Sequence, residues 1–212
     1  AVVALEPDLV LFPSTQEDLR AQLSGLGLRC IRVDQYTVPD ILESIRTVGR
    51  LGGVPDRAQA LIDGLEGRLE RVRTSTQGLP RPRVLVVVGR DYSVAKLDQV
   101  YIAAANSFYG GLVELAGGLN ACDAAAFPYP MVSGEGLMQL RPEVIVEVIH
   151  DRAERGIEPE VVRAAWGELP ELPAVKNGRI HILEGNVVGV PGPRVAEVVE
   201  ALAKLLHPEA RP

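Results

Sequence analysis

The sequence predicts an α/β protein with two Rossmann-like lobes, each with a mostly parallel sheet, joined by one long α-helix. Short apolar, β-branched segments alternate with helical segments, which is the pattern of parallel sheets covered by helices. This alternation stops between residues 37 and 78, where one long helical pattern replaces it. Residues 1–36 hold too few strands to form a stable core alone, so we expect an incomplete first lobe.

The pattern of residues 1–36 predicts one βαβ unit, which forms the partial N-terminal lobe. An apolar strand over residues 8–12 precedes Ser14-Thr15-Gln16-Glu17, which has the form of a capping box that opens a helix to about Leu26. A second strand follows at residues 30–33. Strands joined by such a crossover are expected to be parallel.

Residues 37–78 predict the connecting helices. A short helix begins behind Thr37 and ends at Gly52-Gly53, and Pro55 begins a helix of about 22 residues and roughly 33 Å. Its apolar face has helical spacing and consists of Val54, Ala58, Leu61, Ile62, Leu65, Leu69 and Val72.

Residues 79–212 predict the C-terminal lobe. Its first strand, at residues 83–88, is the most apolar segment of the chain. Asn106 or Ser107 caps a helix that continues through Ala116, and Ser133 caps a short helix to Leu140. The pattern then predicts a strand at 144–148, a helix at 159–166, a strand at 179–183 and a last helix at 193–207.

Composition limits the classes of function. The chain has 212 residues, 47% of them hydrophobic, and 22 basic against 28 acidic residues give a net charge of −6. Nucleic acid is therefore not an expected partner, because phosphate binding depends on clustered Lys and Arg. The chain contains no run of about 20 apolar residues, so the sequence predicts no membrane span. The start AVVALEPDLVL has no Met and suggests a beginning in mid-fold, which leaves secretion open.

Ligands of open parallel sheets bind beyond the carboxyl ends of the strands. This rule selects Phe12, residues 89–92, residues 150–151 and residues 184–186, and it suggests a cleft lined by aromatic side chains. Tyr129 is expected to be exposed, since Pro128 and Pro130 hold its segment extended. Phe108 and Tyr109 are expected to pack under their helix and Phe127 to anchor a loop.

No convincing catalytic or metal-binding set is present. His150, His181 and His207 lack the spacing of metal ligands, and no phosphate-binding glycine motif occurs. Cys30 and Cys122 are expected to be buried free thiols. The sequence therefore predicts no enzyme, no metal site and no cofactor.

Glu17 and Glu135 each lie in the first turn of a predicted helix, one in each lobe. A local role is one interpretation, because the helix dipole favours carboxylates there. The other is a pair of acidic contacts for a basic partner.

Eight segments, in order, carry a family resemblance. Besides the long helix, they are ALEPDLVLF, RPRVLVVVG, SFYGGLVELAGGLNA, FPYPMVS, LRPEVIVEV, LPAVKNGRIHIL and PGPRVAEVVEALAKLLHPE. Together they resemble the helical-backbone (class III) periplasmic substrate-binding proteins, the cobalamin, haem and ferric-siderophore receptors of ABC importers. The vitamin B12-binding type is most similar.

The resemblance implies a periplasmic or extracytoplasmic protein, with or without a lipid anchor before residue 1. It would hold a corrinoid, ferric siderophore or haem in an inter-lobe cleft lined by Phe12, Arg90, Tyr92, Tyr101, Tyr129 and Asn186. By the same resemblance, Glu17 and Glu135 would dock on arginines of the ABC permease dimer.

Two other interpretations stay open. One is a chelatase or nitrogenase-like enzyme subunit on a similar two-lobed scaffold, which would need His and Cys converging on the cleft. The other is an adaptor fragment without a ligand.

Overall fold

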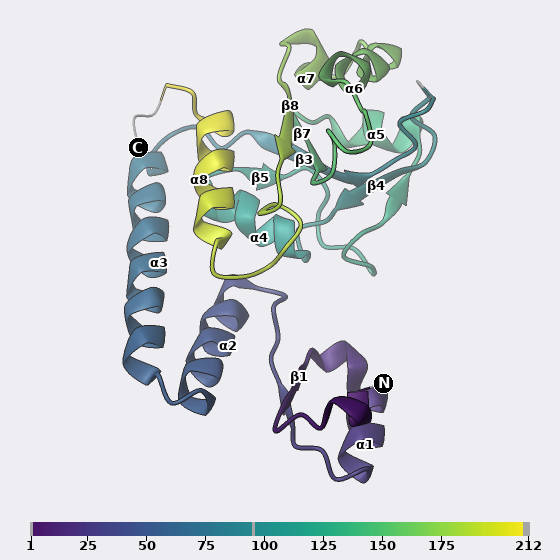
Figure 1. Ribbon diagram of the computed structural model, residues 1–212. Coiled ribbons are helices and arrows are strands. Elements are labelled where there is room, and N and C mark those ends of the chain that lie inside the picture. The colour runs from purple at the N-terminus through teal and green to yellow at the C-terminus, as the bar shows by residue number, and fades with distance from the viewer. Residues whose placement is uncertain (1, 95, 210–212) are drawn as a thin grey trace. The chain divides into compact units, whose positions relative to one another are not determined.

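The computed structural model describes residues 2–94 and 96–209, which form two compact units. The first unit ends at Gly64 and the second begins at Leu65, so the boundary falls within one long helix, α3 (Pro55–Thr76). The expected division into residues 1–36, 37–78 and 79–212 stays a prediction. Figure 1 labels the elements of both units.

The first unit opens with the predicted βαβ arrangement. Its elements are η1 (Val2–Leu5), β1 (Val10–Phe12), η2 (Ser14–Gln16), α1 (Glu17–Gly25) and β2 (Cys30–Arg32). β1 and β2 are parallel, as expected, with Leu11 opposite Ile31.

The predicted capping box at Ser14 is wrong. Gln16 is the N-cap of α1 and makes no capping bond through its side chain. The backbone N–H of Ser14 instead donates to Asp34 Oδ1 at 2.8 Å, and residues 14–16 form a 3₁₀ turn. The carboxylate of Asp34, which lies beyond β2, thus binds the turn in which the local sequence predicted a helix cap.

The connecting helices follow the expected pattern. α2 (Val38–Leu51) begins with a capping box between Thr37 and Asp40. The chain turns at Gly53, where φ is +69°, and α3 then has the expected length of 22 residues. Within the first unit α2 and α3 pack closely, since a Cβ on Gly49 would lie 2.2 Å from the Cβ of Ala58.

The buried stripe of α3 is narrower than expected. Ala58, Ile62, Leu65 and Val72 are buried, but Val54 and Leu61 are 42% and 43% exposed. In the second unit, Arg68 of α3 donates to both carboxylate oxygens of Glu200, at 2.8 and 2.7 Å. This bidentate pair binds α3 to α8 (Val195–Leu206), which runs beside it (Figure 1).

The second unit is built on a six-stranded sheet with the order β6-β4-β3-β7-β8, and β5 pairs with β3 beside this path. β3, β7, β8 and β5 are parallel, whereas β4 is antiparallel to both of its neighbours, β3 and β6. The strands are β3 (Arg83–Gly89), β4 (Val100–Ala103), β5 (Leu119–Asn120), β6 (Met131–Val132), β7 (Val144–Ile149) and β8 (Ile180–Glu184).

Helices cover both faces of this sheet, as the alternating pattern predicted. On one face, Leu85 and Ile145 pack in a cluster with Leu137, Ala165 and Ala174. These three come from α5 (Gly134–Leu140), α6 (Pro159–Ala165) and α7 (Pro173–Lys176); η3 (Trp166–Glu168) follows α6. On the other face lie α8 and α4 (Phe108–Leu115), in contact with each other (Figure 1).

Two of the predicted caps are confirmed by hydrogen bonds. Ser107 Oγ accepts from the N–H of Gly110 at 3.0 Å, and Ser133 Oγ accepts from that of Gly136 at 3.3 Å. Across residues 2–94 and 96–209, no helix is long and apolar enough to cross a membrane.

Glycine substitutions test the packing of the helices. Nothing lies within 4 Å of a Cβ on Gly64, in the interior of α3, so Gly64→Ala should raise the free energy of unfolding by about 1 kcal/mol. Gly117 has φ +82°, and its Cβ would lie 2.8 Å from Nε2 of His207. Gly117→Ala should therefore lower it by about 2 kcal/mol. Urea unfolding measures the free energy of unfolding of both variants. A change of the same sign in the two variants would contradict this packing.

Candidate functional site

The candidate site lies where the parallel strands of the second unit end, here called the carboxyl edge. β3 ends there at Gly89, and Gly89 pairs with Tyr101 at the start of β4. Tyr101 in turn pairs with Met131 of β6. Tyr101 and Met131 therefore lie at the same edge as the loops that follow β3, β7 and β8.

A hollow of about 470 Å³ opens at this edge between β3 and β4, and we call it the β3–β4 hollow. Its charged lining residues include Asp91, Lys96 and Asp98. Lys96 pairs with Asp98. Asp91 accepts the hydroxyl and the backbone N–H of Ser93, at 2.6 and 2.8 Å, and these bonds lower the pKa of Asp91. The remaining residues of the lining are Gly89, Arg90, Val94, Gln99 and Tyr101.

A second hollow of about 380 Å³ lies next to Tyr92, and we call it the Tyr92 hollow. Asp91 contributes to both hollows, so the segment that follows β3 separates them. The other walls come from Ser93 and from Arg155, Gly156, Ile157, Glu158 and Val161.

Four exposed apolar side chains, here called the aromatic edge, belong to β4, to β6 and to the segment before β6: Tyr101, Phe127, Tyr129 and Met131. The exposure expected for Tyr129 is confirmed, but the expectation that Phe127 anchors a loop is wrong, because its side chain is 73% exposed. The carbonyls of Pro128 and Pro130 accept the N–H groups of Ala104 and Ile102. This pairing holds the segment along β4.

Tyr109 connects α4 to the loop that follows β8. Its hydroxyl donates to the carbonyl of Val188 at 2.5 Å, and its ring meets that of Phe108 edge to face, with centroids 5.5 Å apart. Burial raises the pKa of Tyr109 to about 12. Val188 is buried while Asn186 in the same loop is exposed, so the predicted ligand residue Asn186 is accessible at the carboxyl edge.

Arg90 and Tyr92, both predicted ligand residues, point into the second unit. Arg90 Nε donates to Oε1 of Glu147 and the Tyr92 hydroxyl donates to Oε2, each at 2.9 Å. Trp166 Nε1 also donates to Oε1 at 2.9 Å. The side chains of Arg90 and Glu147 are 1% and 0% exposed. Direct contact between the Arg90 guanidinium and a ligand would require this network to open.

The Tyr92 ring lies close to two arginines. The guanidinium carbon of Arg90 is 4.4 Å from the ring centroid and that of Arg155 is 5.4 Å from it. Burial, and then the negative charge of Glu147, raises the pKa of Tyr92, so this phenol stays protonated and donates a hydrogen bond to the carboxylate.

Glu147 is the residue that sequence reasoning missed. The sequence predicts the apolar strand around it, and all six residues of β7 are buried. A single carboxylate within such a run signals a buried partner, because an unpaired charge there is costly. The sequence therefore indicates that Glu147 has a buried partner, but it does not show which residues are the partners.

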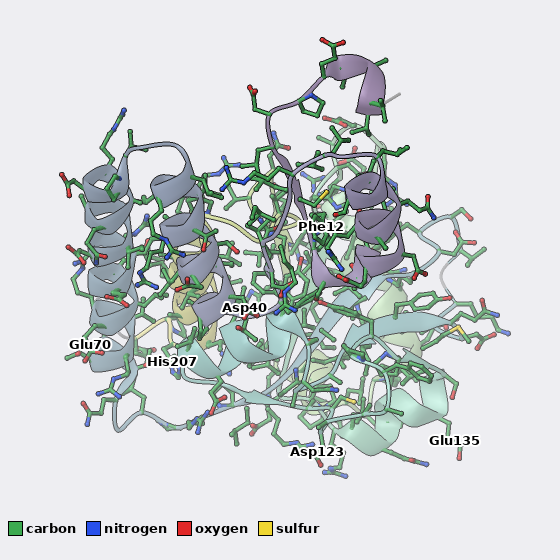
Figure 2. All side chains as sticks on the ribbon, turned by 90° about the horizontal axis from the view of Figure 1, so that it is seen from below. Phe12, Asp40, Glu70, Asp123, Glu135 and His207 are labelled. Carbon is green, nitrogen blue, oxygen red and sulfur yellow. The ribbon has the colours of Figure 1, made fainter. Side chains whose placement is uncertain are left out.

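The roles of the other predicted site residues stay predictions. Phe12 ends β1 in the first unit and is only 4% exposed. Glu17 lies in the first turn of α1 and accepts from Arg20 Nε at 2.5 Å. Glu135 lies in the first turn of α5, exposed and directed outward (Figure 2). The inter-lobe cleft also stays a prediction.

Histidine and cysteine do not gather at the carboxyl edge. Within the described part of the chain, no three His, Cys, Asp or Glu side chains are grouped so that they could hold a metal ion. Cys30 and Cys122 are free, as expected, but they are half-buried rather than buried. Burial raises the pKa of the Cys122 thiol.

A model of the periplasmic binding protein family matches residues 1–187, and the chain belongs to this family. Solved structures agree with the fold. A periplasmic haem-binding protein from Pseudomonas aeruginosa gives a TM-score of 0.78 at 26% identity, over 100% of this chain and 76% of that one. The vitamin B12-binding protein of Vibrio cholerae also gives 0.78, at 23% identity, over 97% of this chain and 76% of that one.

Curated relatives are similar along nearly the whole chain. An ABC transporter substrate-binding lipoprotein of Bacillus subtilis is 25% identical, over 98% of this chain and 64% of its own length. A cobalamin-binding protein of Halobacterium salinarum is 29% identical, over 98% of this chain and 55% of its own length. The chain thus spans a little over half the length of these relatives.

The Tyr109 phenol should make stability depend on pH. The pKa of Tyr109 is about 12 in the folded protein, above the ordinary 10.0. Its contribution to the free energy of unfolding is therefore complete below pH 10 and is lost between pH 10 and 12. Absorbance at 295 nm should show one tyrosine titrating near pH 12 that Tyr109→Phe removes. At neutral pH the free energy of unfolding of the same variant should be about 1 kcal/mol lower, because phenylalanine cannot make the hydrogen bond to Val188. An unchanged titration curve would contradict the assignment.

Proposed function

We propose that this chain is part of the substrate-binding component of an ABC importer, and that it captures a corrinoid, haem or ferric chelate and delivers it to the permease. The observation that carries the proposal is the set of exposed side chains of the aromatic edge, of which Tyr101 lines the β3–β4 hollow. The names of the relatives support it, since they include an ABC substrate-binding lipoprotein, a cobalamin-binding protein and a haem-binding protein.

The exposed side chains at the carboxyl edge suit a large, flat ligand. Tyr101 and Met131 are paired neighbours on adjacent strands, so their side chains form one apolar surface. Aromatic and thioether groups bind flat apolar ligands by stacking and burial, and a few polar groups then set orientation. Asn186, Gln99 and Lys96 supply such polar groups at this edge.

We propose binding without catalysis. An enzyme on a similar scaffold would need converging His and Cys side chains, and none of the groups in the described part of the chain suggests a metal or cluster site. A location outside the cytoplasm, with a lipid anchor, is proposed by analogy with the Bacillus subtilis lipoprotein.

Ligand titration tests the binding proposal. Cyanocobalamin, haemin and a panel of ferric siderophores would each be added while Trp166 fluorescence and melting temperature are followed. We expect one of them to bind, and Tyr101→Ala or Tyr129→Ala to weaken it about tenfold by removing a stacking surface. Leu119→Ala is the control, because Leu119 pairs with Arg83 at the opposite end of β3. No response to any compound would contradict the proposal.

Charge reversal tests the proposed permease contacts. Glu17→Lys and Glu135→Lys should each abolish uptake in cells without changing ligand affinity, because a basic docking partner would repel the new charge. Glu70→Lys on the exposed side of α3 is the control, and Figure 2 shows both Glu70 and Glu135. Weaker ligand binding in either variant would instead place that glutamate in the ligand site.

A further inference from the structure

Glu147 is the single charged residue of β7. Its carboxylate accepts hydrogen bonds from Arg90, Tyr92 and Trp166, and it is fully buried. Stability alone is a weak reason for such a group, because apolar residues of similar volume often replace a buried ion pair without loss. A role connected with the adjacent surface is therefore the better explanation.

Two of the three partners of Glu147 line the hollows, one each. Arg90 lines the β3–β4 hollow and Tyr92 lines the Tyr92 hollow. The guanidinium of Arg90 is further bound by the carbonyl of Val162, at 3.2 Å from Nη2, and by that of Asp91, at 3.4 Å from Nη1. Glu147 thus turns the positive charge of Arg90 into the protein, away from anything that enters the β3–β4 hollow.

The charge balance of the β3–β4 hollow follows from this arrangement. Glu147 neutralises Arg90, and Asp98 pairs with Lys96. Asp91 then remains as an acidic group at the hollow, and its lowered pKa keeps it ionised. An anionic group placed in this hollow would meet a net negative charge and no available guanidinium.

We propose that Glu147 is a specificity-determining positioning residue for the ligand site. By holding Arg90 and Tyr92 inward, it makes this face of the second unit select a metal chelate with neutral amide or apolar groups at its edge over one with carboxylates. The inference rests on the proposed function and deepens it, because it names the chemical class that this face accepts.

The test compares two macrocyclic metal chelates that differ in the charge at the edge of the ring. Cyanocobalamin presents neutral amides and haemin presents two propionate carboxylates. The ratio of their dissociation constants would be measured for the unaltered chain, for Glu147→Gln and for the Arg90→Met/Glu147→Met double variant. Glu143→Gln is the matched control, since Glu143 binds the backbone of Arg83 at the other end of β3.

The unaltered chain should prefer cyanocobalamin at least tenfold. Glu147→Gln leaves the Arg90 charge without its counter-ion and should shift the ratio toward haemin about tenfold, while the double variant should return it to the starting value. Glu143→Gln should leave it unchanged. Trp166, the single tryptophan of the chain, should report the altered network through a change in its emission.

A purely structural Glu147 would behave differently. In that case Glu147→Gln would lower the melting temperature and alter Trp166 emission, and the ratio of the two dissociation constants would not move; that result overturns the inference. Should Glu147→Gln not fold, Glu147→Asp serves instead, because its shorter carboxylate loosens the pair and should shift the ratio in the same direction. Preference of the unaltered chain for haemin would overturn the inference alone, as would binding of a ferric siderophore but of neither probe. No response to cyanocobalamin, haemin or any siderophore would overturn the proposed function with it.

Discussion

The second unit depends on one buried carboxylate. Glu147 lies in the middle of β7, where an unpaired charge would cost several kcal/mol. Its three partners come from beyond β3 and from η3, which lie far apart in the sequence. Its burial is therefore tolerable only when these elements have closed around it, and the same hydrogen bonds hold the loop after β3 against the sheet.

This constraint divides the carboxyl edge into two kinds of surface. The strong polar groups after β3 are turned inward and satisfy one another, whereas the aromatic edge along β4 and β6 is left exposed. A site with its most basic group withdrawn and its aromatic rings presented is suited to binding a flat ligand by contact.

The long helix α3 has a comparable anchor. Its buried stripe continues through Leu65 and Val72, and Arg68 adds a two-point bond to Glu200 of α8. The periodicity of α3, its length and the break at Gly52-Gly53 were all predictable, because they depend on spacing within a short window. Its ion pair was not, since 132 positions separate Arg68 from Glu200.

The sequence by itself determined the α/β class, the parallel strands β3, β7 and β8, the long helix and the caps at Ser107 and Ser133. Each of these follows from local spacing or local hydrogen bonding. Tertiary structure decided the rest. It paired the short strands β4 and β6 with β3, bound Ser14 to Asp34 in place of a helix cap, and turned Arg90 and Tyr92 toward Glu147. Those outcomes depend on partners distant in the chain, which no local pattern specifies.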